Sequence, residues 1–366
     1  MAKISGVLTV RNQPKGEAFL EQISGKKPLF VLTIATSETG KISGISAAGK
    51  MPEITDYTPP ADAELLLLGK CKCFDGVPVT PDGIPTPALI SMSALRLADV
   101  PVLVASGGLR VKPQVPFLEL GGSPGGDIRS GKAVVDVAEV VERAKVAGRH
   151  LAKLADYLVI GESIPGGTTT ALGVLSAMGV KAEGKVSSSM PLNPHDLKIE
   201  AVRSGLAAAG GGFGSFGDDP IGAVGCVGDP MMAAFAGLVL GAAGQVPVLM
   251  AGGTQMTAVL AVVAGLDADV LCNVAIGTTR WVAADKSSDI CGIVDQIVDV
   301  AVLAADLDFG GSRFDGLKAY EKGIVKEGVG AGGSSIAAMA RFEGAITRES
   351  LLAEIERNYA ALMGLK

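Results

Sequence analysis

The chain has few aromatic residues, few charged residues and few metal-binding side chains. Of its 366 residues, 4% are aromatic and 19% are charged, and there are two histidines and five cysteines. Cys71 and Cys73 form the only close cysteine pair, and no CxxC spacing occurs, so the sequence argues against a zinc site. The odd cysteine count and the lack of an export signal favour reduced thiols, and we expect a cytoplasmic protein without a metal or a cofactor.

Basic surface and long uninterrupted apolar runs are also scarce. The net charge of −6 argues against a nucleic-acid partner, which requires a basic face. The segment Met1–Lys15 lacks the apolar core of a signal peptide. The most apolar region, Met231–Leu271, is interrupted by Pro247 and by several glycines, so no clean span of 20 residues remains. We therefore expect no membrane span.

Glycine and small apolar residues are abundant instead. The chain has 50 glycines and is 48% hydrophobic, whereas glycine usually makes up about 7% of a protein. Short apolar runs are followed repeatedly by a glycine-rich turn and then by a helical segment, which is typical of parallel sheets. We predict an α/β fold with a mostly parallel Rossmann-like sheet and helices on both faces.

The alternation of apolar runs, glycine-rich turns and helical segments predicts where the domains, strands and helices lie. We also expect a large α/β domain over 61–333 and a smaller peripheral part formed by 1–60 and 334–366. Buried strands are expected at 30–34, 63–68, 100–105, 117–120, 157–160, 247–250 and 270–276, and helices at 88–98, 133–155, 171–178, 197–209, 289–305, 334–340 and 348–362.

One glycine-rich segment, Tyr157–Ala171, has the pattern of an anion site. An apolar run up to Ile160 precedes Gly161, Gly166 and Gly167, and three threonines then lead into a helix. Free backbone N–H groups and the positive end of the helix dipole favour a phosphate at such a turn. Glu162 does not fit a simple phosphate site, because its carboxylate repels an anion; a ligand that also develops positive charge would explain it.

Three further segments carry candidate functional residues. Glu327 lies in a second glycine-rich loop at 323–333, and Lys198 lies near the start of a helix for which Asp196 is a plausible N-cap. The loop Gly126–Lys132 matches GxxxxGK but is followed by Ala133, where a P-loop needs Ser or Thr for magnesium.

Several of these motifs resemble those of nicotinate-nucleotide–dimethylbenzimidazole phosphoribosyltransferase. The residues GESIPGGTTTA at 161–171 resemble its GEMGIGNTTxA motif, and KEGVGA at 326–331 resembles GEGTGA. The segments at 195–206 and 228–242 are similar to its LxxKIAVVxxAL and GGxEIAAMAGAIL segments. The match runs in the same order from about residue 125 to about residue 340, and the chain looks like the variant subfamily of archaea and cyanobacteria, often left uncharacterised.

The chain departs from this family at several positions. Its N-terminal third does not match the KPPGSLG opening, and Ile324 and Met231 stand where the family has Arg and Glu. Thr278 and Thr279 stand roughly where the family has an HxSAEPGH loop. Glu162, Glu327 and Lys198 keep their places.

The resemblance implies a function and a set of site residues. A phosphoribosyl group would pass from nicotinate mononucleotide to a benzimidazole-type or purine base with inversion at C1′, giving α-ribazole 5′-phosphate for the lower loop of cobalamin. The resemblance also implies a homodimer. Glu327 would be the general base and Glu162 would stabilise the ribosyl cation; phosphate and ribose would be bound by Gly161, Gly166, Gly167, Thr168, Thr169, Lys198, Gly328 and Gly330.

Two other readings of the residues stay open. The Gly126–Lys132 loop could serve a phosphotransfer enzyme, in which case Lys132 would be essential and Glu327 would not. Alternatively, the protein could be a non-catalytic regulator that binds a nucleotide or another metabolite. The sequence does not specify the acceptor among dimethylbenzimidazole, another benzimidazole and adenine.

Overall fold

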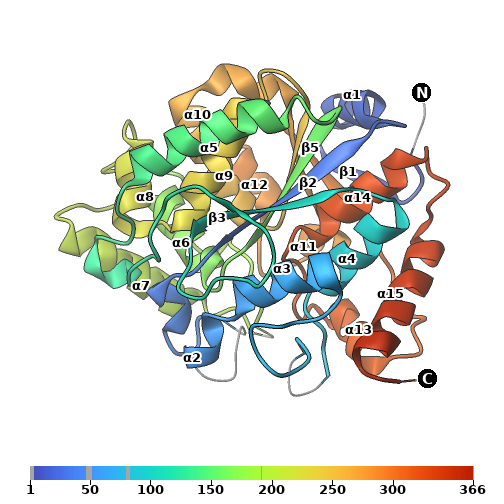
Figure 1. Cartoon of the computed structure of the whole chain (residues 1–366). Helices are drawn as coiled ribbons and strands as arrows, with labels where there is room; N and C mark the ends of the chain where they lie inside the picture. The colour runs from blue at the N-terminus through green and yellow to red at the C-terminus, as the bar shows by residue number, and fades with distance from the viewer. Residues whose placement is uncertain (1–3, 47–51, 80–82, 191, 366) are drawn as a thin grey trace.

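The strands of the computed structural model form a single sheet (Figure 1). The structure describes residues 4–46, 52–79, 83–190 and 192–365. Within them the strand order is β1-β8-β7-β6-β5-β2-β3-β4, and only the β1–β8 pair is antiparallel. The predicted α/β fold with a mostly parallel sheet is confirmed. The strands are β1 (Val7–Arg11), β2 (Pro28–Ala35), β3 (Val102–Gly108), β4 (Leu118–Glu119), β5 (Tyr157–Ser163), β6 (Val248–Ala251), β7 (Val274–Thr279) and β8 (Ala301–Ala305).

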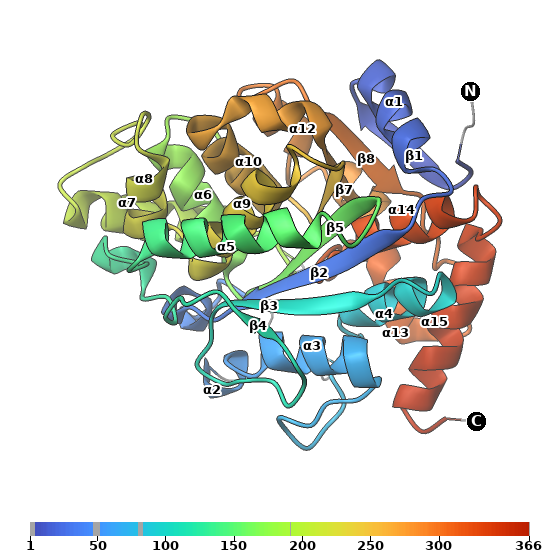
Figure 2. The ribbon, with the colours of Figure 1, turned by 45° about the horizontal axis from the view of Figure 1, so that its top comes forward.

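Helices cover both faces of this sheet, and each face has its own hydrophobic core (Figure 2). Strand β2 contributes to both cores, because successive side chains of a strand point to opposite faces of the sheet. Val31 packs into one core, whereas Phe30 and Leu32 pack into the other. One face carries α5 (Val137–Leu151), α6 (Gly167–Ala177), α7 (His195–Ala208), α8 (Pro220–Val227), α9 (Pro230–Ala242), α10 (Gln255–Leu266) and α12 (Ile290–Val294).

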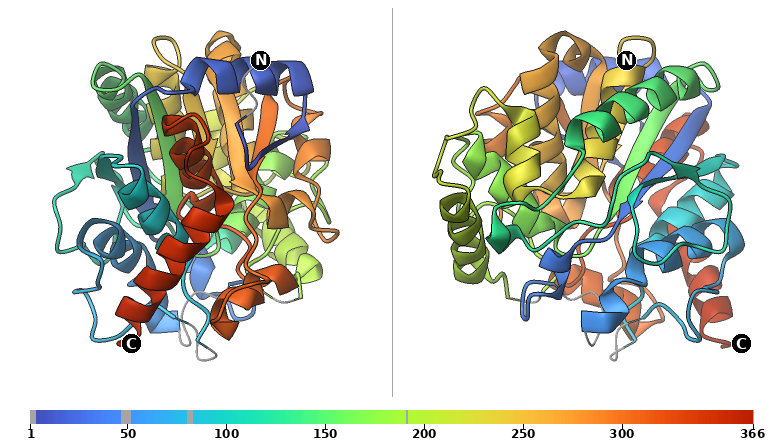
Figure 3. Two further views of the ribbon diagram at one scale, coloured as in Figure 1. Left: turned by 90° about the vertical axis from the view of Figure 1, so that its right-hand side faces the viewer. Right: turned by 60° about the vertical axis from the view of Figure 1, so that its left-hand side comes forward.

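The opposite face carries α1 (Gln13–Ile23), α3 (Thr58–Leu68), α4 (Ala88–Leu97), α14 (Ala331–Arg341) and α15 (Arg348–Leu362). In Figure 3 the red C-terminal helix α15 crosses this face, and the green helix α5 lies on the other. Shorter helices are α2 (Pro52–Thr55), α11 (Arg280–Ala283) and α13 (Asp315–Lys318). No helix within the described ranges is both long and apolar enough to cross a membrane.

The direction in which strands are added reverses between β2 and β5. From β2 the chain adds β3 and β4 on one side; it then returns to β5 on the other side and adds β6, β7 and β8 outward. The loops that leave β2 and β5 at their carboxyl ends therefore diverge over opposite faces of the sheet. Ligand crevices in open α/β sheets form at this kind of switch point.

Several sequence-based element predictions were wrong in type or extent; helix α6, for example, begins at Gly167 and not at residue 171. Residues 63–68 belong to helix α3, because the preceding Pro59 and Pro60 start a helix that is buried on nearly all sides; a continuous apolar run does not distinguish such a helix from a strand. The predicted helix 289–305 is helix α12 followed by strand β8. Helix α5 begins at Val137 instead of residue 133, and β7 begins at Val274 after a 3-10 turn over Ala268–Asn273.

The terminal segments contribute to the main cores. Strand β2, from the segment 1–60, lies between β5 and β3 in the interior of the sheet. Helix α14, most of which comes from the segment 334–366, packs against β5, β6, β7 and β8. Parts of both segments therefore lie in the interior of the fold; the division into a domain over 61–333 and a smaller peripheral part stays a prediction.

Close packing between α5 and α9 depends on three glycines. A Cβ atom on Gly237 would collide with the carbonyl oxygen of Val141, and one on Gly241 would collide with that of Lys145. In the other direction, a Cβ atom on Gly148 would collide with the carbonyl oxygen of Leu238. Without these side chains, the two helix backbones come into direct contact, and this explains part of the glycine excess.

We predict that Gly237→Ala lowers the free energy of unfolding by about 1–3 kcal/mol, because the added methyl group forces the two helices apart. Thermal or denaturant unfolding monitored by circular dichroism measures this change. The matched control is Gly244→Ala, since no atom lies within 4 Å of a Cβ atom built there. Equal stability of the two variants would contradict the role assigned to the α5–α9 contact.

Candidate active site

A cavity of about 660 Å³ opens at the carboxyl edge of the sheet, where the loops after β2 and β5 diverge. Its walls come from segments far apart in sequence: the region after β2, helix α3, the 74–79 and 84–87 segments, and the turn after β5. The loop 187–189, the turn after β6 and the loop before α14 complete it. The cavity therefore occupies the switch point.

Glu162 lies near the end of β5 and reaches this cavity. Its side chain is buried, and Nε2 of Gln255 donates a hydrogen bond to Glu162 Oε2 at 3.4 Å. Burial raises the pKa of Glu162 well above its usual value, and the nearby carboxyls of Glu327, Asp229 and Asp62 raise it further. Burial and these neighbours thus both favour the protonated form of the Glu162 carboxyl.

Glu327 reaches the same cavity from the loop that precedes α14. The backbone N–H of Gly332, in the first turn of that helix, donates to both of its carboxylate oxygens at 3.2 Å, and the N–H of Gly328 donates at 3.1 Å. Thr278 Oγ1 contributes a longer hydrogen bond of 3.4 Å. Burial raises the pKa of Glu327 to about 7, although these N–H groups oppose the shift. This carboxyl can therefore gain or lose a proton near neutral pH.

Four other predicted site residues line the cavity. Gly166 has a φ of 80° and precedes helix α6, and Gly167 begins that helix. A side chain on Gly167 would collide with the amide of Gln255, so glycine is required for the contact between Gln255 and Glu162. Thr168 and Gly328 complete this group.

The remaining four predicted residues lie outside the cavity lining. Gly161 and Gly330 pack against each other: a Cβ atom on Gly161 would lie 3.3 Å from the Gly330 Cα atom. These two glycines allow β5 and the start of α14 to approach closely. Thr169 is buried, and its hydroxyl has no hydrogen-bond partner among the described residues. The fourth is Lys198.

Lys198 is fully buried in α7 and stabilises the loop before it. Its Nζ donates to the carbonyl oxygen of Ser187 at 2.6 Å and to Asn193 Oδ1 at 3.0 Å. Burial, together with the positive charge of Lys326, lowers the pKa of Lys198 to about 7. A direct contact between Lys198 and a phosphate remains a prediction. Asp196 lies in the first turn of α7, and the N-cap position is taken by Pro194, so the N-cap assignment was wrong.

Several polar residues that line or border the cavity were not predicted from the sequence. Asp62, in α3, lines the cavity, accepts hydrogen bonds from Ser163 Oγ at 2.7 Å and Thr86 Oγ1 at 2.9 Å, and has a pKa raised to about 6 by burial. The only indication of Asp62 in the sequence was that an acidic residue stands beside an apolar run. Gln255 gave no sequence signal beyond its glycine-rich turn, because its role depends on a contact with β5.

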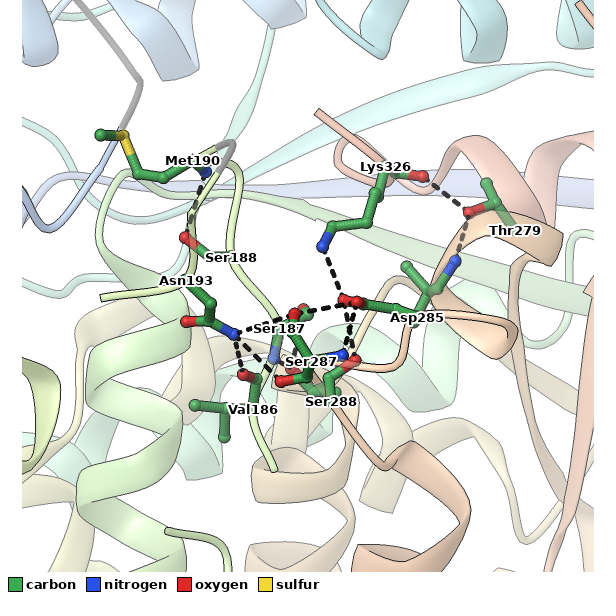
Figure 4. Close-up of polar contacts among 12 residues, drawn as sticks. Val186, Ser187, Ser188, Met190, Asn193, Thr279, Asp285, Ser287, Ser288 and Lys326 are labelled. Carbon is green, nitrogen blue, oxygen red and sulfur yellow. Dashed lines mark hydrogen bonds and ion pairs between the residues drawn. The ribbon is translucent and has the colours of Figure 1, made fainter. Parts of the chain in front are cut away.

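A buried ion pair was also missed. Lys326 Nζ lies 2.6 Å from Asp285 Oδ2, and the two side chains are 9% and 8% exposed (Figure 4). Thr279 Oγ1 fixes the Lys326 backbone by donating to its carbonyl oxygen at 2.6 Å. Lys326 and Asp285 lie 41 positions apart in the chain, so their spacing carries no signal of the pair.

The Gly126–Lys132 loop lies apart from this site. None of its residues lines the cavity, and Arg129 forms an ion pair with Asp127 at 2.6 Å. Gly131 packs against Gly205 of α7, and helix α5 begins only at Val137. The loop therefore lacks the direct connection to a helix N-terminus that holds phosphate in a P-loop.

Relatives of this chain are found among archaeal proteins. It is 46% identical over 351 residues to a UPF0284 protein of Sulfolobus acidocaldarius, covering 94% of this chain and 99% of that protein. A UPF0284 protein of Methanothermobacter thermautotrophicus is 48% identical over 325 residues, covering 88% and 90% of the two chains. No protein-family model matches the chain.

Solved structures with the same fold come from Thermus thermophilus. One is its nicotinate-nucleotide-dimethylbenzimidazole phosphoribosyltransferase, with a TM-score of 0.56 and 16% identity over 97% of this chain and 92% of that one. The other is described as CobT, with a TM-score of 0.57 and 18% identity over 97% and 95%. At these identities the likeness establishes the fold, in agreement with the resemblance of the motifs. The chain thus belongs to the UPF0284 protein family, and it has the fold of these two Thermus thermophilus structures.

Proposed function

We propose that this protein transfers a phosphoribosyl group from nicotinate mononucleotide to a ring nitrogen of a benzimidazole-type base. Inversion at C1′ would give an α-riboside 5′-phosphate. The observation that carries this proposal is the pair Glu162 and Glu327, two carboxyls with raised pKa values that line one cavity at the switch point. The shared fold with the Thermus thermophilus enzymes supports it.

Glu162 stabilises positive charge in this mechanism. The nicotinate ring of the donor is a pyridinium, and the sugar in the transition state resembles an oxocarbenium ion. A cation bound beside Glu162 favours the ionised carboxylate, which opposes the effect of burial on its pKa. The ionised carboxylate then interacts most strongly with the charge that develops at C1′.

Glu327 acts as the general base. The acceptor nitrogen attacks C1′ from the face opposite nicotinate, the C1′–N bond to the pyridinium breaks, and its electron pair returns to the ring nitrogen. The other nitrogen of the acceptor loses its proton to Glu327. A carboxyl with a pKa of about 7 suits this transfer at neutral pH, and the amides of Gly328 and Gly332 hold it in place.

The cavity also offers an apolar wall for a planar base. Phe74, Val77 and Pro78 come from the segment after α3, and Pro85 and Pro87 come from the segment before α4. Flat apolar surfaces of this kind bind aromatic rings, with few polar groups needed to fix orientation. We propose a benzimidazole or a purine as the acceptor; the homodimer and the cytoplasmic location stay predictions.

We predict that the purified protein converts nicotinate mononucleotide and at least one base from a benzimidazole and purine panel into an α-riboside phosphate, detected by mass spectrometry. Glu327→Gln should lower the rate about 10²–10⁴-fold, because a proton acceptor is lost. Glu142→Gln, which removes an exposed carboxyl on α5, is the control and should keep the rate. Mononucleotide binding without product from any base would instead support a non-catalytic regulator.

We predict that kcat/KM for the acceptor base falls as the pH drops below about 7. Glu327 is increasingly protonated there and cannot accept a proton, so kcat/KM should fall about tenfold per pH unit well below its pKa of about 7. Initial rates between about pH 5 and about pH 9 measure the profile on both sides of that pKa. In Glu327→Gln the residual rate should lack this acid limb; an unchanged limb in that variant would assign the base to another group.

A further inference from the structure

Both acidic and basic groups lie around the cavity. The carboxyls of Glu162, Asp62 and Asp229 lie near the start of α6, and the charges of Asp229 and Asp62 both act on Glu162. Asp229 accepts a hydrogen bond from Thr170, in the first turn of that helix. Lys326 and Lys198 lie close enough together for the positive charge of Lys326 to lower the pKa of Lys198.

Lys326 is the one lysine or arginine among the described residues that line the cavity. Its ammonium group has three N–H donors. Within the described chain, Nζ has one hydrogen-bond partner, Asp285, at 2.6 Å. Two donors thus remain for a ligand, and Lys198 has its hydrogen bonds committed to the loop 187–193.

Asp285 holds this ammonium in a fixed place. Besides the bond from Lys326, its carboxylate accepts hydrogen bonds from the Ser287 backbone N–H at 2.9 Å, Ser287 Oγ at 2.8 Å and Ser288 Oγ at 3.0 Å (Figure 4). Burial acts to raise the pKa of Asp285, but the bonds from Lys326 and Ser287 keep it below its usual value. Asp285 therefore stays ionised and keeps Lys326 at the cavity wall.

The start of α6 is a poorer place for a phosphate. The N–H groups of a first helical turn attract anions, but here the buried carboxyls of Glu162, Asp62 and Asp229 lie near this turn and the end of β5 that precedes it. A phosphate that carries up to two negative charges would be repelled by any of these that is ionised. A cationic pyridinium is attracted to the same carboxyls. The charge distribution therefore favours one orientation for a ligand with a cation at one end and an anion at the other.

We propose that Lys326, positioned by Asp285, binds the 5′-phosphate of the mononucleotide donor, and that the donor lies with its phosphate toward Lys326 and its pyridinium toward Glu162. This proposal rests on the proposed function, because it takes a phosphorylated pyridinium riboside as the ligand. It assigns to Lys326 the phosphate contact that the sequence suggested for Lys198 and the start of α6.

The test compares two donors, nicotinate mononucleotide and nicotinate riboside, which lacks the phosphate. In the wild-type protein the phosphorylated donor should have the higher kcat/KM. In Lys326→Met the ratio of the two kcat/KM values should fall about tenfold to a hundredfold, because a charge-assisted hydrogen bond to phosphate is lost. The loss should appear mainly in KM for the mononucleotide, with little change for the riboside.

Three further variants separate this role from a structural one. Lys326→Arg keeps the positive charge and should retain most of the preference for phosphate. Asp285→Asn removes the charge that positions Lys326 and should reduce the preference partly. Lys286→Met removes an exposed lysine next to Asp285 and should leave the ratio unchanged, which controls for net charge. An unchanged donor ratio in a folded Lys326→Met protein would overturn the proposal and favour the start of α6 as the phosphate site.

Calorimetric binding of the two donors separates this proposal from the proposed function. If the wild-type protein forms no product with any base, the transferase proposal fails, yet binding still tests the role of Lys326. Preferential binding of the mononucleotide that disappears in Lys326→Met would support the phosphate site without catalysis. Equal binding of both donors by the wild-type protein would reject it.

Discussion

Two glutamates that face one cavity set the electrostatics of the site. Glu162 lies near the end of β5, Glu327 precedes α14, and burial raises both pKa values. Two such carboxyls titrate as a coupled pair, since the first charge opposes the second. Without a cationic ligand, burial and the mutual repulsion of the two carboxyls favour a protonated form of the pair, and the binding of a cation favours release of the proton. A cationic ligand offsets the free-energy cost of burying the pair. In the proposed function, the positive charge of the donor would therefore contribute to its binding.

Much of the fold was predictable because helix and strand periods differ and because each βα turn is marked by glycine. The strands 30–34, 100–105 and 157–160 were located on that basis. The misassignment of α3 has a physical cause: this helix is buried on nearly all sides, so its apolar run has no polar face to reveal a helical period. The position of β2 within the sheet could not be predicted from its own sequence, because strand order depends on contacts with β5 and β3, which lie far away in the chain.

The candidate site was predictable only where its residues lie within motifs. Glu162 and Glu327 were found because each lies in a glycine-rich turn, and the structure places both at one cavity. Lys326 and Asp285 are 41 positions apart in the chain and come into contact only in the folded structure. Asp62 lies in helix α3, part of which was predicted as a strand. The sequence around a polar residue that lies outside a motif does not indicate whether that residue lines a cavity.

The glycines of the two glycine-rich motifs, at 161–171 and 326–331, have different physical roles, although nothing in the sequence distinguishes them. Gly166, Gly167 and Gly328 lie at the cavity. Gly161 and Gly330 instead let the start of α14 approach β5 closely. This contact brings the amide of Gly332 to Glu327 and sets Glu327 near Glu162. A side chain at Gly161 would press on Phe30 and on Gly330, and would thereby disturb the start of α14, whose Gly332 amide donates to Glu327. Motif glycines can thus be required for the position of a cavity carboxyl as much as for ligand access.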